Sequence, residues 1–275
     1  MAGRKILETY LHKHNSGDPE SRSIMNSRLP QLNGYRALVF DLDGTLYPSL
    51  PDLERQYKES LRFTAMSVAN CSAAAADSIL HAMRAAGQHA VEGLARLSGT
   101  DPNVLLEEIY FRLDLAGIRE DRGLASVLSI LASRIRLLVL TNSSRGHAER
   151  VLDRLGLGCL PIRTYGMEDA DFKQKPDPVV YRKLLLSETL TPTQLLYFDD
   201  ASANIDTACS MGISTVHIVP AATHRGAVDL TLPATAPAWA SSTVESFLRE
   251  VLTSKSSGAI PYAPPSGRTD PSSPA

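Results

Sequence analysis

The chain has 275 residues, of which 43% are apolar, and a formal net charge of -2 at pH 7. A chain of this length and apolar content can bury a substantial core and is expected to form one large globular domain or two small ones. The near-neutral charge and the lack of a dense Lys/Arg block exclude nucleic acid or an anionic membrane as the main partner, but not a small, locally bound anion.

Targeting and redox signals are weak. The first twenty residues scatter charges among their apolar positions, and no apolar run is long enough to cross a bilayer, so neither a secretory signal nor a membrane span is expected. Cys71, Cys159 and Cys209 are odd in number and far apart, which favours reduced thiols over disulfides or zinc. We therefore expect a cytoplasmic protein.

The predicted elements alternate between strands and helices. After a loose polar leader over residues 1–34, the first short apolar run is "RALVFD" at 36–41, and similar runs follow at 136–141, 195–200 and 214–219. The segments between the later runs, such as "HAERVLDRLGL", have apolar residues at three- and four-residue steps. The pattern predicts an α/β fold: a Rossmann-like, doubly wound parallel sheet with helices on both faces.

Residues 48–118 interrupt this alternation, because they contain helical patterns only. Asp101 and Pro102 have the N-cap and first-turn positions of one such helix. The sequence therefore predicts a core at 35–47 and 119–254 with a small all-helical cap inserted after the first strand. Ser242 and Glu245 have capping-box spacing ahead of a last helix, and the Ser/Pro/Gly-rich tail at 255–275 is expected to be disordered.

Polar residues gather where the predicted strands end. Asp41 and Asp43 follow the first strand, Thr141 follows the second, and Asp199 and Asp200 close the third. Ligands of doubly wound sheets bind at this edge. Carboxylates placed so closely need a cation or a shared proton between them, and oxygen ligands favour Mg²⁺ together with a substrate phosphate.

These residues resemble the four motifs of the haloacid dehalogenase-like (HAD) superfamily. "DLDGT" at 41–45 is similar to its first motif, "LTN" at 140–142 to its second, Lys175 in "KPDP" to its third, and "FDD" at 198–200 to its fourth. All four occur in the family's order over residues 36–219. Four ordered motifs are far more specific than a single DxDGT.

The resemblance implies a role for each residue. Asp41 would be the nucleophile that forms an aspartyl-phosphate, and Asp43 the acid and then base. Mg²⁺ would be held by Asp41, the main-chain carbonyl of Asp43, and Asp200, with Asp199 as a second ligand or a partner through water. Asp43 also indicates a phosphatase, since the halide-removing members lack an acid there.

The phosphoryl group would have partners of its own. The resemblance implies that the Thr141 hydroxyl and the Asn142 amide hold its oxygens, while Lys175 stabilises the charge on nucleophile and phosphoryl group. Asn204 has two interpretations: it could orient an active-site group or merely occupy a first helical turn. Gly44 is expected to permit the tight turn after Asp43.

Substrate identity is less constrained. The stretch "AMRAAGQHAVEGLARLSG" with "DLDGTLYP" and "YFDDASANI" is most similar to the pyrimidine 5'-nucleotidase branch, although many of those relatives have Asn at the position of Gly44. We expect a nucleoside 5'-monophosphate, pyrimidine preferred, with Gln88, His89 and Arg96 as candidate contacts or plain loop residues. Another small phosphorylated metabolite, a phosphomutase reaction and a catalytically idle regulatory relative are the alternatives. His81, His89 and His217 have no metal-ligand spacing and are expected on the surface or in the core. The sequence does not decide the oligomeric state.

Overall fold

The computed structural model describes residues 30–219 and 238–254. Within them lies one six-stranded parallel sheet with the order β3-β2-β1-β4-β5-β6. The strands are β1 (Ala37–Phe40), β2 (Arg136–Leu140), β3 (Ile162–Tyr165), β4 (Leu195–Asp199), β5 (Ser214–Ile218) and β6 (Ala238–Ser241). The order reverses beside β1, so the predicted α/β doubly wound sheet is confirmed.

Side chains of the central strands alternate between two apolar cores. Leu38 and Phe40 of β1 point into one buried cluster, while Ala37 and Val39 point into the other. The first cluster receives α6 (Arg122–Ala132), α7 (Arg145–Arg154) and α10 (Val244–Ser254). The second receives α8 (Pro178–Glu188) and α9 (Ser202–Ser210). Because helices cover both faces, the central strands are apolar throughout and leave polar residues only at their ends.

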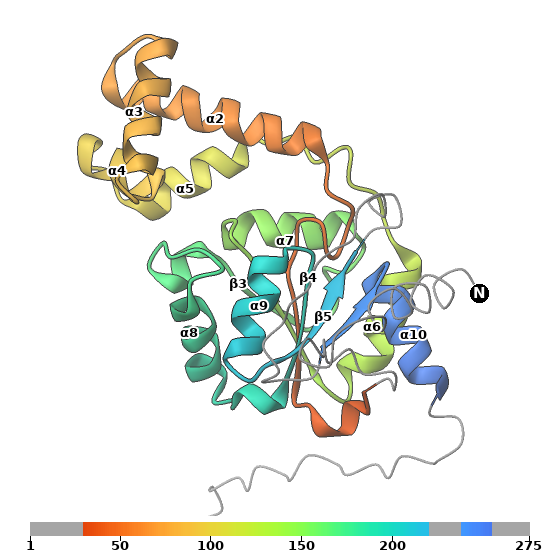
Figure 1. The fold of residues 1–275 in the computed structure, drawn as a ribbon. Coiled ribbons are helices and arrows are strands. Elements are labelled where there is room, and N and C mark those ends of the chain that lie inside the picture. Colours follow the sequence, from red (N-terminus) through yellow and green to blue (C-terminus); the bar gives the residue numbers. More distant parts are fainter. Residues whose placement is uncertain (1–29, 220–237, 255–275) are drawn as a thin grey trace, which may run out of the picture.

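Four helices follow β1 and form a separate lobe, coloured orange to yellow in Figure 1. They are α2 (Pro51–Ala69), α3 (Ala73–Ala85), α4 (Ala90–Ser98) and α5 (Pro102–Phe111). As predicted, Asp101 caps α5, with its side chain accepting from the Asn103 N–H at 2.8 Å, and Pro102 begins the helix. The boundaries predicted for this cap, 48 and 118, stay a prediction.

The lobe shares the first apolar cluster with the core, which fixes it beside α7. Polar contacts add to this packing: Arg150 of α7 donates to the main-chain carbonyl of Tyr110 at 2.8 Å, and the Gly146 N–H donates to Glu107 of α5 at 3.2 Å. The lobe therefore has a defined position over the core, near the end of β2.

Several expectations need amendment or lie outside the described residues. Short 3-10 turns occupy Leu32–Gly34, Met167–Ala170 and Pro192–Gln194, and Leu32 is buried at the end of the predicted leader. The rest of that leader and the tail at 255–275 lie outside the described residues. The capping box at the last helix is wrong by one position: Thr243, not Ser242, accepts from the Ser246 N–H, because α10 begins at Val244.

Candidate active site

Three adjacent strands deliver the polar residues of the site to one edge of the sheet. β1 pairs with β2 on one side and β4 on the other, with Phe40 opposite Val139 and Phe198. The next residues along these chains are the motif residues, so the register alone brings Asp41 and Asp199 together. The Asp41 N–H donates to the Phe198 carbonyl at 2.8 Å and fixes the first of them.

Three carboxylates converge at this edge. Asp41, Asp199 and Asp200 each offer one oxygen such that all three atoms lie within 4.8 Å of one another. Burial raises the pKa of Asp41 to about 7, and the neighbouring Asp199 adds to it despite the opposing charge of Lys175. Burial, then Asp199, also raises the pKa of Asp200. The raised pKa values of Asp41 and Asp200 show that their negative charges are incompletely compensated, and a cluster of oxygen ligands of this kind fits a divalent cation such as Mg²⁺.

Gly44 makes room for one of these carboxylates. Its φ is +90°, a conformation that L side chains rarely adopt, and a Cβ there would lie 2.3 Å from Asp200 Oδ2. The expected role of this glycine in the turn is therefore only half of the explanation. The other half is the close approach of the Asp200 side chain to the backbone after Asp43.

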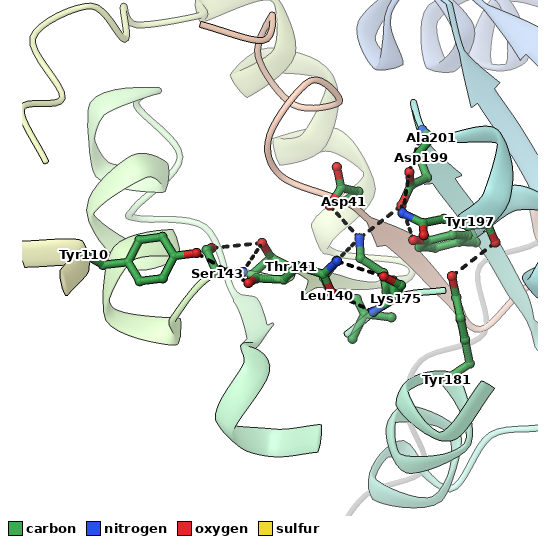
Figure 2. A network of polar contacts seen from close by, with 12 residues as sticks. Asp41, Tyr110, Leu140, Thr141, Ser143, Lys175, Tyr181, Tyr197, Asp199 and Ala201 are labelled. Carbon is green, nitrogen blue, oxygen red and sulfur yellow. Dashed lines mark hydrogen bonds and ion pairs between the residues drawn. The ribbon is translucent and has the colours of Figure 1, made fainter. Parts of the chain in front are cut away.

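Lys175 lies at the centre of the network, with its side chain only 1% exposed. Figure 2 shows it between Asp41 and Asp199, and its Nζ donates to Asp41 Oδ1 at 2.5 Å, the Leu140 carbonyl at 2.8 Å and Asp199 Oδ2 at 3.0 Å. Burial by itself lowers the pKa of this lysine, but the two carboxylates outweigh burial and hold the pKa above its ordinary value. Lys175 is therefore a fixed positive charge beside Asp41.

Asp199 is more thoroughly occupied than the sequence indicated. It is fully buried and, besides Lys175, it accepts from the Ala201 N–H at 2.8 Å, from Asn204 Nδ2 at 3.0 Å on each oxygen, and from the Tyr197 hydroxyl. Asn204 thus orients an active-site group, which decides between its two readings. Asp200 is only partly buried, and among the described residues no other side chain donates a hydrogen bond to its carboxylate. The predicted preference for Asp200 as the direct ligand is compatible with this contrast.

The two residues after β2 behave differently from each other. Thr141 is 2% exposed, and its Oγ1 lies 2.9 Å from Ser143 Oγ and accepts from the Ser143 N–H at 3.1 Å. The side-chain amide of Asn142 holds the backbone of Lys175, accepting from its N–H at 2.7 Å and donating to its carbonyl at 3.0 Å. The Asn142 side chain therefore positions Lys175, and its main-chain N–H is available for an anion.

Asp43 is set apart from the other carboxylates. Its side chain is exposed and does not belong to the group formed by Asp41, Asp199 and Asp200. Its predicted contact with the metal runs through the main-chain carbonyl and is not a side-chain contact. The carboxylate accepts a hydrogen bond from the Tyr47 hydroxyl. This placement suits a group that exchanges protons with a substrate.

Two residues support the site through contacts that the sequence did not indicate, although His217 was expected on the surface or in the core. His217 is 4% exposed and its Nε2 lies 2.9 Å from the main-chain carbonyl of Asp200, so it is a core histidine that steadies the loop carrying that carboxylate. Burial lowers its pKa. Its position on β5, directly opposite Asp199 in the register, was the available signal. Tyr47 belongs to the quoted stretch "DLDGTLYP", but nothing in that stretch indicated that its hydroxyl contacts Asp43.

The helical lobe adds aromatic side chains near the end of β2. The Tyr110 hydroxyl donates to the Asn142 carbonyl at 3.4 Å, and its ring lies 5.1 Å from Tyr57 and 4.9 Å from His147, between centroids. Of the residues proposed from the lobe, His89 faces the ring of Phe172 at 6.2 Å, on the loop that leads to Lys175.

The other two proposed contacts lie elsewhere. Arg96 is exposed and donates weakly to the Glu92 carbonyl of its own helix at 3.4 Å, while Gln88 lines an apolar groove of the lobe with Val68 and Leu97. The structure therefore does not bring Arg96 and Gln88 to the site.

Comparison with known proteins agrees with the geometry. A model of the haloacid dehalogenase-like hydrolases matches residues 35–212. The chain belongs to this family. The HAD-like chain is 32% identical over 191 residues to a phosphoglycolate phosphatase of Rhodospirillum rubrum, covering 66% of this chain and 78% of that protein. It is 28% identical over 188 residues to validoxylamine A 7'-phosphate phosphatase of Streptomyces hygroscopicus subsp. limoneus, covering 66% and 84%.

Solved structures support the fold of this HAD-like hydrolase. A HAD phosphatase from Thermococcus onnurineus has a TM-score of 0.51 at 18% identity, covering 79% of this chain and 97% of that one. The L-2-haloacid dehalogenase of Xanthobacter autotrophicus has a TM-score of 0.50 at 17% identity, covering 79% and 98%. At such identities the likeness concerns the fold alone. In the part of the chain that the structure describes, no helix is long and apolar enough to span a membrane.

Proposed function

We propose that this HAD-like hydrolase is a Mg²⁺-dependent phosphomonoesterase that works through an aspartyl-phosphate on Asp41. The enzyme class, a phosphoric monoester hydrolase, follows from the family match and from two curated relatives that are both named phosphatases. The observation that carries the proposal is Asp41 itself: one of its oxygens is held by Lys175, and Asp200 lies within a few ångströms.

The residues divide the reaction between them. Asp41 Oδ1 is occupied by Lys175, so Oδ2 is the oxygen that attacks phosphorus. As the new P–O bond forms, the P–O bond to the leaving group breaks, and Asp43 gives its proton to the departing oxygen. Asp43 then accepts a proton from the water that attacks the phosphoryl group, and release of phosphate restores the Asp41 carboxylate.

Charge compensation accompanies both steps. Asp41, Asp200 and the main-chain carbonyl of Asp43 would hold Mg²⁺, with Asp199 nearby; when bound, the ion offsets the repulsion between carboxylate and phosphate. The buried ammonium of Lys175 supports the same charge without needing to reorganise. The Thr141 hydroxyl and the main-chain N–H of Asn142 would receive phosphoryl oxygens.

A catalytically idle relative is the less favoured reading. All four motifs are complete, and the network around Lys175 satisfies each of its three protons. Lys175 binds one oxygen of Asp41 and leaves the other oxygen without a hydrogen bond from the described residues, an arrangement that a nucleophile requires and a binding site does not. The chemistry therefore favours turnover.

For the substrate, a nucleoside 5'-monophosphate remains our first candidate. Tyr110 of the lobe reaches the end of β2 through its hydroxyl but is only 8% exposed and packs between Tyr57 and His147. The half-buried Tyr57 is therefore the ring of this pair that is left to contact a base or sugar. The second candidate is 2-phosphoglycolate, because the relative with 32% identity is named a phosphoglycolate phosphatase. The other relative is named for a substrate with a larger leaving group, validoxylamine A 7'-phosphate.

One screen tests the proposal. Purified protein with Mg²⁺ would be assayed for phosphate release from UMP, CMP, AMP, 2-phosphoglycolate and several sugar phosphates, with Asp41→Asn as the control for contaminating phosphatases. We expect metal-dependent release from at least one metabolite and none from the variant. Release by Asp41→Asn at the wild-type rate, or undiminished release in EDTA, would refute the mechanism.

A further inference from the structure

The side chain of Asp43 has one hydrogen-bond partner among the residues that the structure describes. That partner is the hydroxyl of Tyr47, which donates to Asp43 Oδ1. The two residues are four apart in the turn after β1, and their backbones form an isolated β-bridge. The contact therefore depends on a fixed backbone geometry and not on two freely rotating side chains.

The two partners differ sharply in exposure. Tyr47 is 7% exposed, and its ring belongs to the larger apolar cluster of the core, whereas Asp43 is exposed. A ring packed in a core has few rotamers available, so its hydroxyl is held at one point. Asp43 is thus an exposed carboxylate, one oxygen of which is hydrogen-bonded to a tyrosine fixed in the core.

We propose that Tyr47 is a positioning residue that fixes which oxygen of Asp43 exchanges the proton. A tyrosine hydroxyl has a single proton, and here Tyr47 gives it to Oδ1, so Oδ1 acts as an acceptor. The exchangeable proton of Asp43 is then carried on Oδ2. That oxygen remains open to the leaving group in the first step and to water in the second.

This role of Tyr47 rests on the proposed function, and it predicts a difference between substrate classes in the kinetics. In the first step the proton moves from Asp43 Oδ2 to the leaving oxygen while the bond from that oxygen to phosphorus breaks. A poor leaving group such as an alkoxide requires this proton, whereas an activated aryl oxide leaves nearly without it. Loss of the Tyr47 hydroxyl should therefore harm alkyl phosphates selectively. A purely structural defect would harm both classes alike.

The test uses Tyr47→Phe, which removes only the hydroxyl, and compares p-nitrophenyl phosphate with the best alkyl phosphate found in the metabolite screen. We expect kcat/KM, which reports only the steps up to loss of the leaving group and not the shared hydrolysis of the intermediate, to fall roughly tenfold or more for the alkyl phosphate, with Tm nearly unchanged. The aryl phosphate should lose about threefold or less. Tyr35→Phe is the matched control, because it removes a hydroxyl just before β1, at the opposite end of the same strand.

A double-mutant cycle decides whether the hydroxyl acts through Asp43. If it does, Tyr47→Phe should add little to the loss already caused by Asp43→Asn. Equal losses on both substrates, no loss on either, or full additivity with Asp43→Asn would overturn the role of Tyr47. A wild-type protein that hydrolyses neither substrate in Mg²⁺ would instead contradict the proposed function, and this role with it.

Discussion

The Gly44→Ala substitution should have two separable effects, a loss of stability from backbone strain and a displacement of the Asp200 carboxylate. The substitution puts a Cβ at φ +90°, where it would lie 2.3 Å from Asp200 Oδ2 and 2.7 Å from its Cγ. An L residue in the left-handed region costs about 1–2 kcal/mol. The contact itself can be relieved, because the Asp200 carboxylate is the end of a flexible side chain that can rotate away. The additional damage should therefore appear in Mg²⁺ affinity and not in stability.

Gly99→Ala is the matched control for this experiment. Gly99 also has a positive φ, +70°, but an added Cβ there meets nothing within 4 Å. Both variants should lose about 1–2 kcal/mol of unfolding free energy in urea without metal. Only Gly44→Ala should raise the Kd for Mg²⁺, measured by calorimetry, by tenfold or more, which is a loss of about 1.4 kcal/mol of binding free energy. If both variants bind Mg²⁺ as tightly as the wild type, Asp200 is not a direct ligand and the reasoning fails.

Three further predictions concern the charges of the site. Lys175→Met leaves Asp41 and Asp199 buried without their cation. It should lower the unfolding free energy, measured in urea at pH 8, by about 3–5 kcal/mol. Adding Asp199→Asn should restore part of this stability but should not restore activity. Asn142→Ala removes both contacts to the Lys175 backbone and should lower kcat at least tenfold with a smaller change in KM; equal changes in both would contradict a positioning role. Because the folded-state pKa of Asp41 is raised to about 7, its proton stabilises the metal-free protein fully below about pH 4, and this stability is lost as pH rises through 7. Mg²⁺ must displace that proton, so its affinity should fall at low pH. One fixed Mg²⁺ concentration, a hundredfold above the Kd at pH 8, should raise Tm by roughly 5–10 °C at pH 8 and by much less at pH 5. Equal shifts in Tm would show that Asp41 does not bind the metal.

The sequence predicted the central strands well and the edge strands not at all. β1, β2, β4 and β5 were each found to within one residue of their ends, because strands covered on both faces are continuous apolar runs. β3 and β6 were missed. Each is a four-residue strand at an edge of the sheet, and β3, "IRTY", has an exposed arginine within it. A short, half-exposed strand carries too little periodicity to be distinguished from a loop.

The site shows a similar division. Motif order predicted Asp41, Thr141, Lys175 and the Asp199-Asp200 pair at one edge. The register of β1, β2 and β4 brings the strand-end residues together, and the hydrogen bonds of Lys175 place it among them. Apart from Asn204, for which an orienting role was one of two alternatives, the partners that hold those residues were not predicted. Asn142 contacts the backbone of Lys175, 33 residues away along the chain. Such contacts depend on the tertiary path of a loop, which leaves no local pattern in the sequence.

The central claim is that Asp41 becomes covalently phosphorylated during turnover. The most direct measurement is rapid acid quenching of the Asp43→Asn variant during hydrolysis of p-nitrophenyl phosphate, followed by peptide mass spectrometry. This variant should still be phosphorylated by an activated substrate but lack the base that speeds hydrolysis of the intermediate. We predict a phosphoryl group on the peptide containing Asp41, and none when Asp41→Asn is added. Turnover without any phosphorylated peptide, or with the group on another residue, would contradict the account.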